Sequence, residues 1–272
     1  MHLEGPLLLV GCGKMGGALF AGWLERGLAA ASATVVEPGA EAAADAAAKG
    51  ATVVGEAAGL APDFTPAVVV FAIKPQLMAA ALPAYRAMAG PGTVFLSIAA
   101  GTTIGVFTQH LGPEAAIVRA MPNTPAAVGR GMSVLCANPR TGEAQRALCG
   151  DLMAAVGAVA WVDDEALLDP VTAVSGSGPA YVFFMIEALA QAGVEAGLPE
   201  DLAMRLARET VAGAGELVHQ SVDPASTLRR NVTSPGGTTQ AALEVLMAPD
   251  GLQSLMTRAV AAATRRSREL AS

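Results

Sequence analysis

Short apolar segments alternate with segments of helical periodicity between Leu7 and Val162. An unbroken apolar run such as Val68–Ile73 is typical of a strand that is buried on both faces of a parallel sheet. Because strands and helices alternate regularly, we predict an α/β fold with a doubly wound parallel sheet for this part of the chain. The expected strands are Leu7–Val10, Thr34–Val36, Thr52–Val54, Val68–Ile73, Thr93–Ile98, Ile117–Met121, Met132–Ala137 and Ala158–Val162.

The strand patterns stop after Val162, and the rest of the chain has helical patterns only. We therefore expect two domains, residues 1–163 and residues 164–272, the second of them all-helical. Within it, Ser175–Pro179 has the composition of a loop and helix start, and Pro179–Leu198 is apolar nearly all round. Such a helix must be buried on several sides, and the polar residues that interrupt it fit a soluble helix better than a membrane span. We predict that a second copy of the chain covers it, which makes the protein a homo-oligomer.

A Gly-x-Gly-x-x-Gly motif follows the first expected strand directly, and a helical pattern continues from it through about Arg26. In this setting the three glycines permit a tight turn, the close approach of a pyrophosphate and the packing of the helix on the strand. The motif consists of Gly11, Cys12, Gly13, Lys14, Met15 and Gly16. It predicts a Rossmann-type domain that binds a dinucleotide, and the alternative is a glycine-rich turn without a ligand.

The second expected strand ends in Glu37, at the distance from the glycines where a carboxylate holds a ribose hydroxyl. A carboxylate there favours NAD and repels the additional phosphate of NADP, although a solvated strand end is the alternative. Ligands of such sheets lie outside the carboxyl ends of the strands. Polar or glycine-rich residues occur at three more of these ends, in Lys74-Pro75, Ala99–Gly101 and Pro122-Asn123-Thr124. Together with the glycine motif they predict one binding site.

The segment Asn231–Thr239, which we call the 231–239 loop, precedes a helical pattern at Ala241–Met247. Ser234 is a good N-cap, and Pro235 suits the first helical position. Free N–H groups at Gly236 and Gly237, the helix dipole and the threonine hydroxyls would together form a socket for a small carboxylate. The alternative is an ordinary capped helix start.

Composition narrows the possible functions further. Apolar residues make up 53% of the chain and charged residues 15%, so the protein is globular and not disordered. The net charge of −7 argues against a nucleic-acid surface. The three cysteines (Cys12, Cys136 and Cys149) lack disulfide or metal-binding spacing, and the three histidines make no metal-like pattern. We expect no metal, no nucleic acid and no membrane partner, and because no signal peptide pattern is visible, a cytoplasmic location.

Six segments occur together in this chain, and two of them, the fifth and the sixth, are specific. They are Gly11–Gly16, Ala72–Pro75, Ser97–Gly101, Arg119–Pro125, Ala173–Tyr181 and Val232–Thr239. In this order, over nearly the whole chain, they are similar to the pyrroline-5-carboxylate reductase family. Two positions depart from the family: Arg230 stands where aspartate is common, and Glu37 replaces the neutral or basic residues of NADP-preferring members.

The resemblance implies an oxidoreductase of proline biosynthesis, an amino-acid biosynthetic pathway. Such an enzyme transfers hydride from NAD(P)H to the cyclic imine of 1-pyrroline-5-carboxylate, which gives L-proline in the last step. NADPH is commonly preferred in the family. The resemblance also implies a nucleotide-binding domain followed by a helical dimerisation and substrate-binding domain, in a homodimer that often assembles into a larger ring.

The resemblance also assigns roles to residues. Thr239 would be the catalytic residue, because it would hydrogen-bond the ring nitrogen of the imine. The substrate would be bound by Ser175, Gly176, Ser234, Pro235, Gly236, Gly237, Thr238 and Thr239. The cofactor would be bound by the glycine motif and Glu37, together with Ala72, Ile73, Lys74, Pro75, Ile98, Ala99, Ala100, Met121, Pro122 and Asn123.

Two other functions fit parts of the sequence. Dehydrogenases of the β-hydroxyacid or 6-phosphogluconate type share the layout but need a catalytic lysine in the second domain, and residues 164–272 contain no lysine. A nucleotide-binding sensor that has lost catalysis would keep Gly11–Gly16 but could dispense with Ser234–Thr239. Both segments are present here, which favours the reductase.

Overall fold

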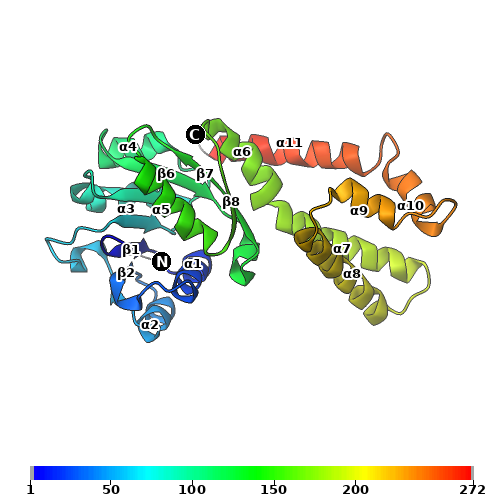
Figure 1. Ribbon diagram of the computed structural model, residues 1–272, viewed down its shortest axis with the longest axis horizontal. Helices are drawn as coiled ribbons and strands as arrows, with labels where there is room; N and C mark the ends of the chain where they lie inside the picture. The colour runs from blue at the N-terminus through cyan, green and yellow to red at the C-terminus, as the bar shows by residue number, and fades with distance from the viewer. Residues whose placement is uncertain (1–2, 271–272) are drawn as a thin grey trace. The chain divides into compact units, whose positions relative to one another are not determined.

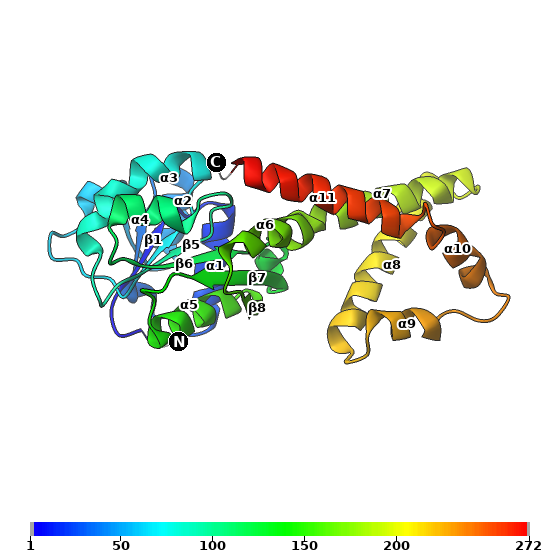
Figure 2. The same ribbon diagram turned by 90° about the horizontal axis from the view of Figure 1, so that it is seen from above.

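The computed structural model describes residues 3–270, which divide into two compact units. The first unit comprises the chain up to Gly176 together with the residues from Ala263 onward. The second unit comprises Ser177–Ala262. The elements of each unit can be followed in Figures 1 and 2.

An eight-stranded sheet forms the centre of the first unit, with the strand order β3-β2-β1-β4-β5-β6-β7-β8. Neighbouring strands are parallel except for β6 and β7, so the predicted α/β fold is confirmed with one antiparallel pair. That pair is joined by a short connection instead of a crossover helix, and antiparallel strands allow such a link. The strands are β1 (Leu7–Val10), β2 (Ala33–Val36), β3 (Thr52–Val54), β4 (Val68–Phe71), β5 (Val94–Ser97), β6 (Ala116–Met121), β7 (Gly131–Ala137) and β8 (Gly157–Trp161).

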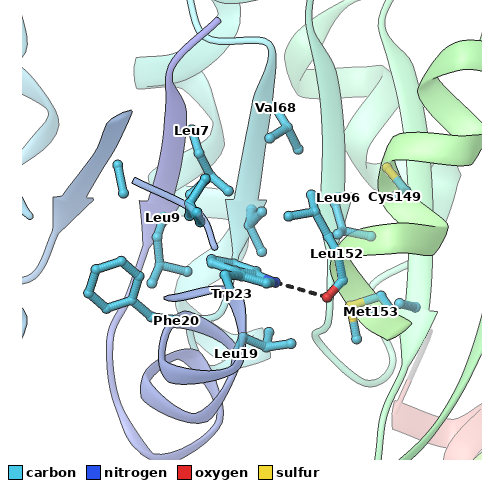
Figure 3. Packing of buried hydrophobic residues seen from close by; sticks show 14 of the residues in the cluster. Leu7, Leu9, Leu19, Phe20, Trp23, Val68, Leu96, Cys149, Leu152 and Met153 are labelled. Atoms are coloured by element: carbon cyan, nitrogen blue, oxygen red, sulfur yellow. Dashed lines mark hydrogen bonds between the residues drawn. The ribbon is translucent and has the colours of Figure 1, made fainter. Parts of the chain in front are cut away.

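Helices cover both faces of this sheet, because successive strand residues point to opposite sides. On one face Leu7 and Leu9 pack with Trp23, whose Nε1 donates a hydrogen bond to the Leu152 carbonyl at 2.8 Å (Figure 3). On the other face Leu8 and Val10 pack with residues of α3 and α4. The helices of this unit are α1 (Lys14–Glu25), α2 (Ala40–Ala48), α3 (Pro75–Ala81), α4 (Ile104–Leu111), α5 (Glu143–Ala154) and α6 (Leu168–Val171).

The second unit is helical throughout. Its helices are α7 (Gly178–Glu195), α8 (Glu200–Gln220), α9 (Ala225–Asn231), α10 (Thr238–Leu246) and the first part of α11 (Leu252–Leu270). The short helix α9 was not predicted from the sequence. Within a single chain helix α7 leaves large apolar side chains exposed, Phe183 at 59% and Phe184 at 68%, as expected of a helix that a second copy of the chain would cover.

Two predictions of local structure are wrong. In Ser175–Pro179 the predicted helix start is confirmed, since α7 begins at Gly178, but the residues before it are not a loop, because Thr172–Gly176 forms a π-helical turn. Pro179 lies in the first turn of that helix, where a backbone N–H would have no partner within the helix, so its missing N–H costs no hydrogen bond. Ser234 is not the N-cap of α10, since that helix begins at Thr238 and its cap is Gly237.

The first unit extends beyond the expected domain boundary after residue 163. Residues from Glu165 to Gly176 pack against the sheet, where Leu168 lies in a cluster with Val134 and Cys136. The last strand nevertheless ends at Trp161, and all later elements are helices. We propose that the sequence boundary between the domains lies between residues 163 and 164, whereas the two compact units of the structure divide after Gly176.

An ion pair ties this extension to the sheet. The Arg119 guanidinium on β6 pairs with Glu165, and the two side chains are only 11% and 30% exposed. The same oxygen of Glu165 accepts a hydrogen bond from the Ile104 N–H at the start of α4, at 2.7 Å. Because Arg119 is largely buried, removal of its carboxylate partner leaves a positive charge in a poorly solvated place.

We predict that Glu165→Ala lowers the free energy of unfolding by about 3 kcal/mol, since an uncompensated buried charge is strongly destabilising. The matched control is Glu114→Ala, which removes the exposed pair between Glu114 and Arg140 and costs about 1 kcal/mol or less. Urea denaturation followed by circular dichroism measures both. Equal losses in the two variants would show that the buried pair has no special role.

Candidate active site

The glycine motif forms the turn between β1 and α1. Gly11 has φ +88°, and a Cβ there would lie 2.7 Å from Ile73 Cγ2. A Cβ on Gly16 would overlap the Gly11 carbonyl oxygen, so both positions require glycine. Gly13, in contrast, has open space where its Cβ would be, and it caps α1 without a side chain. The open start of a twelve-residue helix fits the pyrophosphate of a dinucleotide.

Glu37 supports this turn from the end of β2. Its Oε2 accepts a hydrogen bond from the Cys12 N–H, and its Oε1 accepts one from the Gly39 N–H, both at 2.7 Å. Sequence reasoning expected a ribose contact here and did not find these two bonds. Burial and then the Glu37 carboxylate raise the pKa of the Cys12 thiol, so this sulfur stays protonated near neutral pH.

A hollow of 330 Å³ lies at the carboxyl ends of the strands. It is lined by Met15, Ala72, Ile73, Lys74, Pro75, Ile98, Ala99, Ala100, Met121, Pro122, Asn123, Thr124 and Gly176. The structure therefore brings together predicted cofactor residues from four separate segments. Thr124 was not predicted, although it belongs to the polar segment recognised after the sixth strand, and Gly176 was predicted for substrate instead. The rest of the glycine motif and Glu37 lie outside this lining.

The side chain of Asn123 is hydrogen-bonded at both ends. Its Nδ2 donates to the carbonyl and to the Oγ of Ser175, at 3.3 and 3.2 Å, and its Oδ1 accepts from the Met132 N–H at 2.8 Å. Beside it, a Cβ on Gly176 would overlap the end of the Met121 side chain. The π-helical turn is thus pressed against the end of β6 and forms one wall of the hollow.

In the second unit, the 231–239 loop contains a tight turn in place of the predicted cap. The Gly237 N–H donates to the Ser234 carbonyl at 3.0 Å, and Gly236 has φ +70°. Proline at the second position and a glycine with positive φ at the third are the features of a type II turn. Pro235 and Gly236 therefore turn the chain first, and α10 begins only afterwards.

This turn changes which groups of the loop are available to a ligand. The Gly236 N–H donates to Gln240 Oε1 on α10 at 2.7 Å and the Gly237 N–H to the Ser234 carbonyl, so both N–H groups already have partners. The N–H and hydroxyl groups of Thr238 and Thr239 have no hydrogen-bond partner within residues 3–270. A hollow of 410 Å³ adjoins the loop and is lined by Arg229, Arg230, Thr233, Gln240, Leu243, Glu244 and Met247.

Among the residues that the structure describes, no three His, Cys, Asp or Glu side chains are grouped to hold a metal ion. The chemistry available at the two hollows is that of backbone N–H groups, hydroxyls, lysine and arginine side chains and apolar walls.

Two family models match the chain. The model for pyrroline-5-carboxylate reductase dimerisation matches residues 165–270. The model described as NADP oxidoreductase, coenzyme F420-dependent, matches residues 7–101, which include the glycine motif and the first five strands.

Named relatives cover the whole chain. It is 42% identical over 266 residues to a pyrroline-5-carboxylate reductase of Pseudomonas aeruginosa, which spans 97% of this chain and 96% of the relative. The solved structure of a pyrroline-5-carboxylate reductase from Coxiella burnetii aligns with a TM-score of 0.92 and 32% identity, over 99% of this chain and 100% of that one. A pyrroline carboxylate reductase from Plasmodium falciparum, solved with NADP bound, aligns with a TM-score of 0.81 and 29% identity over 99% of both chains. This chain belongs to the pyrroline-5-carboxylate reductase family.

Proposed function

We propose that this protein reduces the cyclic imine 1-pyrroline-5-carboxylate to L-proline, with NAD(P)H as hydride donor. The observation that carries the proposal is the 42% identity to a named reductase across both halves of the chain. The local geometry agrees with it, because the glycine turn and the strand-end hollow suit a dinucleotide. We place the reaction in proline biosynthesis and in the cytoplasm, and the three cysteines, all free and buried, fit a reducing compartment.

The first unit would bind and orient the cofactor. The N–H groups at the start of α1 would hold its pyrophosphate, and Gly13 leaves room for a close approach. The hollow between Met15, Ala99 and Met121 would receive the nicotinamide against apolar walls that exclude water. When bound, the reduced cofactor supplies the hydride that adds to the carbon of the C=N bond.

The second unit would hold the imine. The N–H groups of Thr238 and Thr239 lie in the first turn of α10, where the helix dipole favours a carboxylate. The Thr239 hydroxyl would hydrogen-bond the ring nitrogen, which carries a proton before and after hydride addition. A protonated imine is already electrophilic, so catalysis requires alignment of donor and acceptor more than a strong base. Hydride transfer requires this loop and the hollow of the first unit to meet in the working enzyme.

We further propose a homodimer that assembles into a larger ring. Exposed apolar side chains are frequent in the second unit and include Phe183, Phe184, Leu217, Val245 and Met247. Exposed large apolar side chains in this number favour an interaction surface in the second unit. Residues Glu165–Glu195 form one helix that could cross a membrane by length and composition. Because the dimerisation model covers this helix, we infer that its apolar side chains contact a second copy of the chain and not lipid.

For the substrate site, we predict that Thr239→Ala lowers kcat/KM for the imine by about 10- to 100-fold, since a hydrogen bond to a charged group is lost. Affinity for NADPH, measured by nicotinamide fluorescence, should change little. Thr239→Ser keeps the hydroxyl and should restore most of the activity. An equal loss of imine turnover and cofactor affinity would contradict the role assigned to Thr239.

For the cofactor site, we predict that Asn123→Ala weakens cofactor binding by about tenfold, because the wall of the hollow loses the bonds that fix it. The matched control is Asn138→Ala. Asn138 is buried where Asn123 is half-buried, and it is likewise bonded at both ends, to the Ala115 carbonyl and the Ile117 N–H, but it does not line the hollow. Both variants should lose similar thermal stability, and only the first should lose cofactor affinity. Unchanged cofactor affinity in Asn123→Ala would count against a positioning role.

For the assembly, light scattering at micromolar concentration should give a mass of at least twice the 27.2 kDa of one chain. The physical reason is that exposed apolar helices of this extent are unfavourable in water unless a partner covers them. A monomeric mass would refute the homo-oligomer.

A further inference from the structure

We propose that this enzyme prefers NADH to NADPH and that Glu37 determines the preference. The inference rests on the proposed function and names the cofactor within it. NADH and NADPH differ only in a phosphate on the 2′-oxygen of the adenosine ribose. A preference must therefore arise from the groups that surround this oxygen, which lies beside the end of β2 in a Rossmann-type domain.

The backbone places Glu37 directly beside the glycine turn. Strands β1 and β2 are parallel neighbours with Val10 opposite Val36, and the Gly11 N–H donates to the Val36 carbonyl at 2.9 Å. The residue that follows Val36 is therefore held next to the residue that follows Gly11. The hydrogen bonds from Cys12 and Gly39 then fix both oxygens of the Glu37 carboxylate.

A fixed carboxylate discriminates in two ways. A carboxylate has about four acceptor positions, of which two are occupied by the backbone N–H groups, so others remain for the ribose hydroxyls of NADH. NADPH has no 2′-hydroxyl to donate, and its phosphate brings negative charge toward the carboxylate. Because backbone hydrogen bonds hold Glu37 from both sides, it cannot turn away without losing them.

The positive side chains on α1 and at the end of α2 are already paired, remote along the helix, or placed at a group that both cofactors share. Lys49, at the end of α2, pairs with Asp45 at 2.7 Å, so its charge is already matched. Arg26 follows the last residue of α1, about 18 Å along the helix from the glycine turn. Lys14 opens α1, at the pyrophosphate that both cofactors share, and so does not distinguish them.

The test measures the dissociation constants of NADH and NADPH by nicotinamide fluorescence, and kcat/KM with each cofactor and pyrroline-5-carboxylate. The wild-type protein should bind NADH at least ten times more tightly than NADPH. Glu37→Gln keeps the size of the side chain and removes its charge, and it should reduce this ratio at least tenfold, mainly by tighter binding of NADPH. The matched control, Glu41→Gln, removes an exposed carboxylate from the first turn of α2 and should leave the ratio unchanged.

Equal or tighter binding of NADPH by the wild-type protein would overturn the proposal, as would an unchanged ratio in folded Glu37→Gln. Circular dichroism checks folding, and Glu37→Ser serves as a second variant; should neither fold, the wild-type ratio decides. A protein that binds NADH preferentially but reduces no imine with either cofactor would refute the proposed function and leave this inference standing.

Discussion

The close approach of backbone to backbone at the glycine turn is the constraint on which the nucleotide site depends. A Cβ on Gly16 would overlap the Gly11 carbonyl oxygen, and a Cβ on Gly11 would overlap Ile73 and the Ala72 carbonyl oxygen just after β4, so neither position accepts a side chain. As a result, the first turn of α1 is open to a ligand. It lies where the strand order reverses, with β2 on one side of β1 and β4 on the other. At that point the carboxyl ends of several strands supply walls for one hollow. The other residues of the nucleotide site can contribute to binding only where this turn is formed.

The second unit obeys a different constraint. Its helices α7 and α8 form a hairpin in which Gly193 lies close to Ala203, but most large apolar side chains of α7 face outward. A helical unit with this surface cannot account for its own stability by burial within one chain. The family to which the chain belongs resolves this through a dimerisation region that includes the helix. The first unit contains large buried clusters of its own, whereas the second leaves many large apolar side chains exposed within one chain.

Periodicity in the sequence predicted every strand to within a few residues, because buried parallel strands are continuous apolar runs. It did not predict that β7 is antiparallel to β6, because the pattern of apolar and polar residues carries no information on strand direction. Helix α9 was missed because Ala225–Asn231 is short and mostly polar. Proline and glycine signal that the chain changes direction but do not specify the conformation, so the type II turn at Pro235 and Gly236 was taken for a helix cap. For the same reason the residues before the correctly predicted start of α7 were taken for a loop instead of a π-helical turn.

The candidate site was predictable where it follows strand ends, and not where it depends on distant pairs. Asn123 and its partner Ser175 lie 52 positions apart, and no local pattern joins them. The hydrogen bonds of the Gly236 and Gly237 N–H groups to Gln240 and Ser234 likewise could not be predicted, because they depend on the conformation of the turn. Short motifs thus pointed to segments that the structure brings together at one hollow, whereas the hydrogen-bond partners of individual groups could be identified only from the structure.

Most of this site consists of backbone and apolar surface, and this has a consequence for where its specificity resides. Hydride transfer to a protonated imine needs alignment and exclusion of water, which glycines, prolines and methionines provide without charge. Backbone groups bind any pyrophosphate and any small carboxylate about equally well. Selectivity between related ligands must then come from the few side chains with a fixed charge or hydroxyl, and Glu37 and Thr239 are two such side chains in different units of the fold. A family built this way can change its cofactor at one strand end while the turn, the hollow and the hydride chemistry remain as they are.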